Sequence, residues 1–234
     1  MKQKPIPPAL TPYLEGKVLL IDKPIKWTSF DMVKKVRWMT KIMKVGHAGT
    51  LDPLATGLLI ICTGKFTKQI NEFMGMQKEY TGSLVLGATT ASYDLEQEPE
   101  NFKSIEAITE LKIKEATKQF IGTIFQMPPQ HSAIKKDGKR LYESARQGIE
   151  VKVDPRQITI DNFEITKINL PHVEFRVLCS TGTYIRSLVH DFGQALGVGA
   201  YMSGLRRTKI GAFIVEDAIQ WEDLEKEITT LLEG

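Results

Sequence analysis

The segment from Gly46 to Gly57 constrains the fold of this chain more than any other segment. It reads Gly-His-Ala-Gly-Thr-Leu-Asp-Pro-Leu-Ala-Thr-Gly and directly precedes the apolar run Leu58–Cys62. An apolar run of this length predicts a buried central strand. Glycine adopts backbone conformations that other residues rarely reach, and it lets a ligand approach the chain closely. The segment therefore predicts a tight turn at the mouth of a sheet that presents Asp52.

Asp52 has two interpretations on local grounds. An aspartate before a proline is a common helix N-cap, with the proline at the first helical position, and such a cap is worth about 1 kcal/mol. The other interpretation is a carboxylate held in place for chemistry. His47 likewise is either a turn histidine bonded to the backbone or a ligand contact. Local chemistry alone favours the structural interpretation of both residues.

The rest of the chain mixes strands and helices without strict alternation. Apolar runs predict strands at 18–21, 78–87, 158–165, 173–179 and 205–213. Caps and periodicity predict helices that begin at Thr28 or Ser29 and that span 104–120, 139–147, 183–196 and 221–232. The acidic residues 88–104 and the Asp137-Gly138 turn are predicted to be irregular. This mixture favours an α+β fold over a doubly wound parallel sheet.

Basic residues are segregated along the sequence. In the helix that begins near Thr28, the side predicted to face inward holds Phe30, Val33 and Val36. The opposite stripe holds Lys34, Arg37 and Lys41. Further basic clusters occur at 135–140 and 206–209. One such cluster is typical of a solvated face, but three in a chain of net charge +3 fit the footprint of a polyanion.

Arg186 and Tyr80 also stand out by their positions. Arg186 lies in the first turn of the helix predicted from Thr183, where a cation faces the positive end of the helix dipole at a cost of up to about 1 kcal/mol. A buried carboxylate partner would compensate for this cost, whereas a surface arginine would leave it unexplained. Tyr80 lies on a predicted strand, where alternation places its ring in the core or in a cleft.

Several chemistries lack their motifs in this sequence. We find no phosphate loop, dinucleotide fingerprint or hydrolase elbow, and the histidines and the two cysteines lack the spacing of metal ligands. Cys62 and Cys179 are expected to be buried small hydrophobes in a reducing compartment. The N-terminus lacks a signal peptide, and the apolar run 58–62 is far shorter than the roughly 20 residues that span a bilayer. We expect a cytoplasmic protein without a metal.

Taken together, these segments resemble the TruB family, the tRNA pseudouridine-55 synthases that modify the T loop. The resemblance runs in order through residues 19–24, 46–64, 78–87, 127–146, 179–186 and 205–213. It implies the pseudouridine synthase catalytic fold, with a mixed, largely antiparallel central sheet flanked by helices. Residues 1–234 would form a single catalytic domain in which 127–153 is a thumb insertion that clamps RNA. Because about twenty residues follow Phe213, a further C-terminal RNA-binding domain is expected to be absent or vestigial.

The resemblance assigns the catalytic roles to three residues. Asp52 matches the nucleophilic aspartate, which overrides its interpretation as a helix cap. Tyr80 matches the tyrosine that stacks on the target base and takes part in proton removal. Arg186 matches the arginine that forms an ion pair with the catalytic carboxylate. The reaction would need no cofactor, because bond breaking and bond making occur within one nucleotide.

Other matched residues are expected to bind substrate. His47 would hold the RNA open around the flipped nucleotide, and Leu205 would line the uracil pocket. The remaining expected substrate or brace residues are Lys23, Pro24, Tyr184 and Asp94. The chain departs from the family at His131, where an aromatic residue is usual, and at 95–97, where a glycine is usual. The expected partner is the T-arm stem-loop of tRNA, bound by a monomer.

Two other functions remain open at this point. A tRNA-binding or folding chaperone would need the basic clusters and the thumb but not Asp52, Tyr80 and Arg186 together. A small-molecule hydrolase using Asp52 as a base would need a paired carboxylate or histidine, and no such arrangement is recognisable. The sequence does not choose between attack by Asp52 at C1′ and attack at C6 of uracil.

Overall fold

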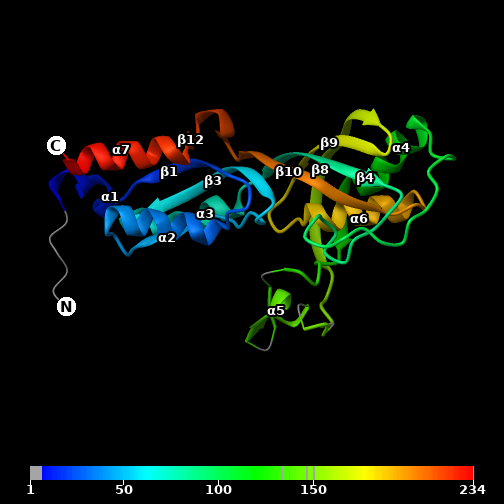
Figure 1. The fold of residues 1–234 in the computed structure, drawn as a ribbon, viewed down its shortest axis with the longest axis horizontal. Helices are drawn as coiled ribbons and strands as arrows, with labels where there is room; N and C mark the ends of the chain where they lie inside the picture. Colours follow the sequence, from blue (N-terminus) through cyan, green and yellow to red (C-terminus); the bar gives the residue numbers. More distant parts are fainter. Residues whose placement is uncertain (1–6, 133, 137, 146, 150, 234) are drawn as a thin grey trace. The chain divides into compact units, whose positions relative to one another are not determined.

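The computed structural model describes residues 7–132, 134–136, 138–145, 147–149 and 151–233. The chain divides into two compact units (Figure 1). The first comprises the chain up to Tyr80 together with the segment from Arg206 onward, and the second comprises Thr81–Leu205. Strands β4 (Lys78–Leu86) and β10 (Ala200–Ile210) contain the points at which the chain passes from one unit to the other.

The first unit contains a sheet in the order β12-β1-β3-β10, with β2 paired to β3 and β11 to β10. Strand β1 pairs with β12 in parallel and with β3 in antiparallel orientation. The other elements of this unit are α1 (Thr11–Glu15), β1 (Val18–Lys23), α2 (Ser29–Thr40), β2 (Val45–His47), β3 (Ala55–Thr63), α3 (Ile70–Gly75), β11 (Phe213–Ile214), β12 (Ile219–Gln220) and α7 (Trp221–Glu233).

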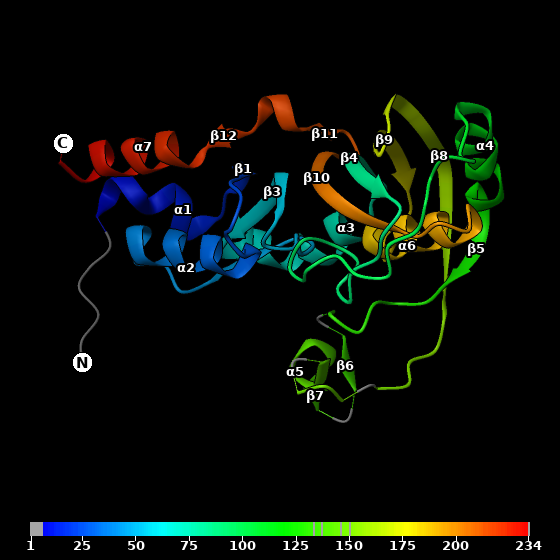
Figure 2. The same cartoon turned by 45° about the vertical axis from the view of Figure 1, so that its right-hand side comes forward.

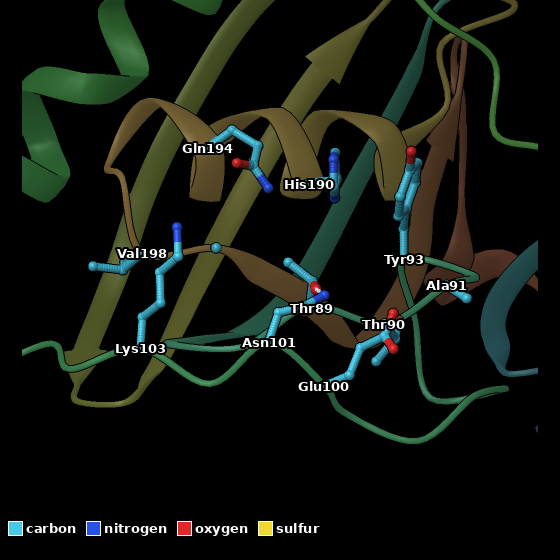
Figure 3. Close-up of a pocket in the computed structure, with 11 residues that line it drawn as sticks. Thr89, Thr90, Ala91, Tyr93, Glu100, Asn101, Lys103, His190, Gln194 and Val198 are labelled. Atoms are coloured by element: carbon cyan, nitrogen blue, oxygen red, sulfur yellow. Dashed lines mark hydrogen bonds between the residues drawn. The ribbon is translucent and has the colours of Figure 1, made fainter.

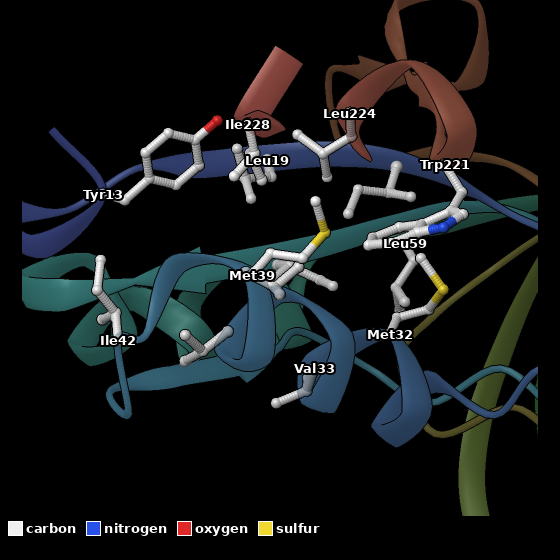
Figure 4. Packing of buried hydrophobic residues seen from close by; sticks show 14 of the residues in the cluster. Tyr13, Leu19, Met32, Val33, Met39, Ile42, Leu59, Trp221, Leu224 and Ile228 are labelled. Atoms are coloured by element: carbon white, nitrogen blue, oxygen red, sulfur yellow. The ribbon is translucent and has the colours of Figure 1, made fainter. Parts of the chain in front are cut away.

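Strand β3 is buried on both faces, as its continuous apolar sequence predicts. Leu59 and Ile61 join a core cluster with side chains of β1, α2 and α7 (Figure 4). Leu58, Ile60 and Cys62 point the other way, into a second cluster that includes Phe73 of α3. The residues of β3 therefore alternate between two cores, one on each face of the sheet.

Helix α2 begins where the sequence predicts. Thr28 is its N-cap and forms a capping box with Asp31, in which each side chain accepts a hydrogen bond from the other residue's backbone N–H. Val33 and Val36 are buried, as predicted. The inward placement of Phe30 is wrong, because its side chain is 50% exposed. Phe30 lies about 100° around the helix axis from Ser29, the first buried residue, which puts it on the outer face.

The second unit contains the sheet order β10-β4-β9-β8-β5, with a separate β6–β7 hairpin. Its own elements are α4 (Glu110–Ala116), β5 (Gly122–Gln126), β6 (Lys135–Lys136), β7 (Lys139–Arg140), α5 (Leu141–Ala145), β8 (Arg156–Asn169), β9 (His172–Cys179) and α6 (Ile185–Ala195). Figure 2 shows α5, β6 and β7 gathered together and joined to β5 and β8 by extended segments. This group lies within the predicted thumb, residues 127–153. The predicted Asp137-Gly138 turn falls partly on residue 137, which is outside the described residues.

Two helices of this unit differ in how well the sequence predicts them. Helix α6 matches its prediction within two residues, and Gly197 follows its end with a positive φ of 80°. The helix predicted from Ser104 begins instead at Glu110, with Thr109 as its N-cap. Ser104 only accepts a hydrogen bond from the N–H of Glu106. Ser104 and Thr109 can both cap a helix, and their local sequences do not favour one of them as the N-cap.

The α+β class is confirmed, as is the mixed and largely antiparallel character of the sheet. Strand β1 is parallel to β12, whereas β1–β3, β2–β3, β5–β8, β8–β9 and β10–β11 are antiparallel. In the second unit, the rings of Phe163 and Phe192 meet edge to face, with their centroids 5.3 Å apart, and join α6 to β8.

Among the described residues, no helix is both long and apolar enough to cross a membrane.

Candidate active site

Asp52 lies in the loop that connects β2 to β3. These strands form an antiparallel pair in which His47 stands opposite Ile61, and residues 48–54 join them. The N–H of Ala55 donates to the carbonyl of Asp52 at 3.0 Å, and β3 begins there. No helix starts after Asp52, so the helix-cap interpretation is wrong. Asp52 is partly exposed, on a turn that leads into a buried strand.

Gly57 allows β3 and β10 to approach closely behind this loop. Its φ is 100°, and a Cβ at this position would clash with the backbone of Arg207, including its N atom at 2.8 Å. Only glycine meets both conditions. The glycine-rich sequence thus serves strand packing as well as the turn itself.

Lys23 is fully buried at the end of β1 and holds the loop from one side. Its ammonium donates to the carbonyls of Trp27 at 2.6 Å, Pro24 at 2.9 Å and Pro53 at 3.4 Å. Burial lowers the pKa of Lys23 to about 8. The nearby carboxylate of Asp52 opposes this shift and the charge of Arg207 adds to it. Lys23 therefore binds the residue next to Asp52 and interacts electrostatically with Asp52 itself.

Ser29, the first residue of α2, holds the loop at a second point. Its hydroxyl accepts a hydrogen bond from the N–H of Leu51 at 2.8 Å and contacts the carbonyl of Leu51 at 3.3 Å as a donor. Ser29 is 1% exposed and Leu51 is 3% exposed. The residue before Asp52 is thus fixed by a buried side chain, although the loop itself has no regular structure.

Arg207 holds the loop at a third point, a role that was not predicted from the sequence. Its side chain is 1% exposed and donates to the carbonyls of Leu58 at 2.8 Å, Gly49 at 3.2 Å and Thr50 at 3.4 Å. One signal was available in the sequence, because Arg207 lies two residues after Leu205 on a strand and so shares its side of the strand.

The basic cluster 206–209 provides only part of the open cationic surface that the sequence suggested, since Arg206 and Lys209 remain 40% and 46% exposed. Arg207 is buried, and Arg206 forms an ion pair with Asp22, with Nη2 and Oδ2 at 2.6 Å. Lys209 lies 3.7 Å from Glu79. These three cations make contacts within the first unit.

His47 and Tyr80 complete the predicted residues of this unit. His47 ends β2, and burial lowers its pKa, with a further lowering from the positive charge of Arg207. The imidazole is therefore neutral near pH 7. Tyr80 lies on β4 with 8% of its surface exposed, on the same side of the strand as the buried Lys78. Pro24 follows Lys23 and is partly exposed.

Arg186 belongs to the second unit and has the buried carboxylate partner that its helix position predicts. Its Nε lies 3.5 Å from Oδ2 of Asp94, and the two side chains are 4% and 2% exposed. The guanidinium also donates to the carbonyls of His131 at 2.8 Å and Ser92 at 3.1 Å. Several contacts thus fix its orientation in the first turn of α6.

Both departures from the family pattern lie next to this ion pair. The carbonyl of His131 accepts from Arg186 as described above, and the N–H of Glu96 donates to Oδ1 of Asp94 at 3.0 Å. The hydroxyl of Ser92 donates to the same oxygen at 2.7 Å. The backbone of the departing segments therefore supports Asp94 and Arg186.

Tyr184 and Leu205 are the remaining predicted residues of the second unit. The backbone of Tyr184 forms two hydrogen bonds with the side-chain amide of Gln126, at 2.8 and 3.0 Å, which join α6 to β5. Leu205 lies on β10 and is 9% exposed. The first unit thus contains Asp52, Lys23, Pro24, His47 and Tyr80. The second contains Arg186, Asp94, Tyr184 and Leu205.

A cavity of about 430 Å³ lies within the second unit (Figure 3). The rings of Tyr93 and His190 stack at 3.9 Å along its wall. Burial lowers the pKa of His190, so this imidazole is neutral near pH 7. The other residues that line the cavity are Thr89, Thr90, Ala91, Glu100, Asn101, Lys103, Gln194, Val198 and Gly199. None of the predicted site residues lines this cavity. Among the described residues, no cluster of His, Cys, Asp and Glu is arranged to hold a metal ion.

Two family models together match residues 37–233 of the chain. Residues 37–185 match the TruB family pseudouridylate synthase N-terminal domain, and residues 186–233 match the tRNA pseudouridylate synthase B C-terminal domain. The tRNA pseudouridine synthase B of Flavobacterium johnsoniae is 58% identical, over 88% of this chain and 93% of that protein. The protein of the same name from Phocaeicola vulgatus is 50% identical, over 90% of this chain and 92% of that protein.

Solved structures give the same fold. A chain of a Cbf5-Nop10-Gar1 complex superposes with a TM-score of 0.73 at 33% identity, over 94% of this chain and 56% of that chain. A chain of an H/ACA RNP bound to a substrate RNA containing 2′-deoxyuridine superposes with a TM-score of 0.72 at 28% identity, over 99% of this chain and 61% of that chain. The present chain therefore spans less than two thirds of the length of these solved chains.

Proposed function

Because the chain belongs to the TruB family and isomerises uridine to pseudouridine in tRNA, we propose that it acts on uridine-55 of the T loop with Asp52 as the nucleophile. The observation that supports this role is the immobilisation of the loop around Asp52. Lys23 binds the carbonyl of the following residue, and Ser29 binds the preceding residue. A carboxylate held from both sides keeps its position while a substrate binds.

The reaction itself needs few groups. The C1′–N1 bond breaks, the uracil turns, and a new bond forms between C1′ and C5. The proton on C5 is released, and N1 ends protonated. The target base must first leave its stack, at a cost of a few kcal/mol. We assign Tyr80 to stack on the flipped base, a contact worth about 1–3 kcal/mol, and to take part in proton removal.

Asp52 must be ionised to attack C1′ or C6. A nearby cation stabilises a carboxylate by Coulomb attraction, and Lys23 interacts with Asp52 in this way. On the family resemblance we also assign Arg186 to pair with the nucleophile. Its position is fixed by Asp94 and by the carbonyls of His131 and Ser92.

The other predicted residues take supporting roles in this proposal. His47 holds the RNA open around the flipped nucleotide, and its neutral ring at pH 7 is suited to a hydrogen-bonding rather than an ionic contact. Leu205 lines the uracil pocket, and Pro24, Tyr184 and Asp94 complete the site. Residues 127–153 serve as the thumb that clamps the T arm. We propose that the protein acts as a monomer in the cytoplasm.

The test uses a T-arm transcript labelled with tritium at C5 of uridine. The wild-type chain should release tritium, and Asp52→Asn should abolish release while leaving tRNA binding largely intact. Asp217→Asn, a change at an exposed residue outside residues 48–54, is the control and should behave as the wild type. Appreciable release by Asp52→Asn would remove Asp52 as the nucleophile. A chaperone without catalysis, which the named relatives do not favour, would bind tRNA but release no tritium from any variant.

A further inference from the structure

The outer face of α2 combines exposed aromatic rings with basic side chains. Phe30 is 50% exposed and Trp38 is 64% exposed, although large aromatic residues of this kind are usually buried. On a helix, Phe30, Lys34, Arg37, Trp38 and Lys41 fall within an arc of about 100°. We call these five residues the α2 outer face. The opposite side of the helix packs into the core of the first unit (Figure 4).

Each ring of the α2 outer face has cations beside it. The ammonium of Lys34 lies 5.0 Å from the centroid of the Phe30 ring, and the guanidinium of Arg37 lies 5.9 Å from it. The ammonium of Lys41 lies 4.9 Å from the centroid of the Trp38 ring. A flat apolar surface beside a positive charge matches a nucleotide, whose base stacks and whose phosphate is an anion.

The α2 outer face begins close to the catalytic loop. Ser29, the first residue of α2, is bonded to Leu51, and Leu51 precedes Asp52. The twelve residues of α2 span about 18 Å at 1.5 Å per residue. An RNA contact along this helix would therefore extend well beyond the single nucleotide that reaches Asp52.

We propose that the α2 outer face is a tRNA-binding surface that stacks unpaired bases on Trp38 and Phe30 and holds phosphates with the exposed Lys34 and Lys41. Arg37 is held beside Phe30 by a hydrogen bond from its Nη2 to the carbonyl of Val45 at 2.7 Å, so it contributes positive charge. The charge of the face favours RNA over a protein partner, because the one carboxylate of the helix, Asp31, already accepts hydrogen bonds from Thr28 and from Lys34. A membrane is disfavoured because the larger apolar side of α2 faces the core. The inference rests on the action on tRNA, and it is independent of the roles assigned to Asp52 and Arg186.

The first test measures the affinity of the full chain for an unmodified tRNA transcript. Trp38→Ala should weaken binding about tenfold, which corresponds to about 1.4 kcal/mol and lies within the range for loss of one base–aromatic stack. Leu14→Ala, which removes a side chain of 48% exposure from α1, is the matched control and should bind as the wild type.

The second test measures how affinity falls with salt. Lys41→Gln should make the logarithmic slope of affinity against salt shallower by about 0.7–0.9, the effect of one lost phosphate contact. Lys226→Gln on α7, whose side chain is 77% exposed, should leave the slope unchanged. Binding is the readout in both tests, so they remain informative if the proposed nucleophile is wrong.

Three results would overturn the proposal. One is affinity within twofold of the wild type for both Trp38→Ala and Lys41→Gln. Another is an equal loss in the two control variants, which would indicate a nonspecific effect. The third is binding of the wild-type chain to vesicles of anionic phospholipid that Trp38→Ala abolishes, while the same variant binds tRNA as the wild type does.

Discussion

At the scale of single residues, two buried cations fix the loop that contains Asp52, residues 48–54, through backbone carbonyls. Arg207 and Lys23 direct their hydrogen bonds to carbonyl oxygens, and none of these described bonds goes to a carboxylate. A buried carbonyl that loses its donor costs about 1–3 kcal/mol. Both residues should therefore stabilise the fold as well as shape the site.

Arg207→Lys should destabilise the protein by about 2 kcal/mol and reduce turnover, because the three carbonyls are bonded by three different nitrogens of the guanidinium and a single ammonium cannot replace all of them. Arg206→Lys is the matched control in the neighbouring position. The Arg206 side chain, which forms an ion pair with Asp22, is 40% exposed. This substitution should therefore lower the free energy of unfolding by less than about 1 kcal/mol. Urea unfolding measures both free energies. Equal losses in the two variants would contradict the role given to Arg207.

Lys23 should make stability depend on pH in the alkaline range. Its pKa is lowered to about 8 in the folded chain, whereas an unfolded lysine titrates near about 10.4. Below the lower value it is charged in both states, and the folded state bears the full cost of burying the charge. Between the two values the unfolded chain binds more protons, so this cost diminishes as pH rises.

The measurement compares the free energies of unfolding of the wild type and Lys23→Met. Methionine does not titrate, and other ionisable groups are common to both proteins, so their contributions largely cancel. The wild-type value minus the variant value should increase from about pH 7.5 to about pH 10. A constant or falling difference over this range would show that the ammonium of Lys23 is not penalised by burial.

At the scale of elements, the packing of β3 against β10 depends on Gly57. The close approach puts the backbone of Arg207 where a side chain at position 57 would begin. The same backbone leads into the side chain that bonds Gly49 and Thr50. An error in this strand pairing should thus displace the loop that contains Asp52.

Gly57→Ala should cost clearly more stability than a positive φ alone explains. Gly182→Ala is the control, because Gly182 has a φ of 83° but open space around its missing Cβ. The control should lose about 1–2 kcal/mol from backbone strain. Gly57→Ala should lose at least about 2 kcal/mol more, or fail to unfold cooperatively. Thermal and urea unfolding of the pair measure the difference, and similar losses would contradict a clash at Gly57.

At the scale of the whole molecule, local patterns predicted most of the elements, and long-range contacts explain what they missed. The apolar run 58–62 predicts a strand and the periodicity of 183–196 predicts a helix from neighbouring residues alone. Both elements are present, as β3 and α6. The sequence predicted that Arg186 needs a carboxylate, but not that Asp94 supplies it, because the two lie far apart in the chain. The role of Arg207 was missed for the same reason. Its hydrogen-bond acceptors are backbone carbonyls far away in the chain, and every residue type has a backbone carbonyl.

Ser29 links the first turn of α2 to the residue before Asp52 through one hydroxyl that serves both the N–H and the C=O of Leu51. Because both hydrogen bonds use the same hydroxyl oxygen, a movement of Ser29 breaks them together. The loop is therefore released from α2 at this point in one step. The amide hydrogen of Leu51 should therefore exchange with solvent only when the start of the helix frays. A ligand that binds α2 and suppresses this fraying would then slow exchange at Leu51 without contacting it. Reduced motion at the start of the helix would in this way reduce the motion of the Asp52 carboxylate.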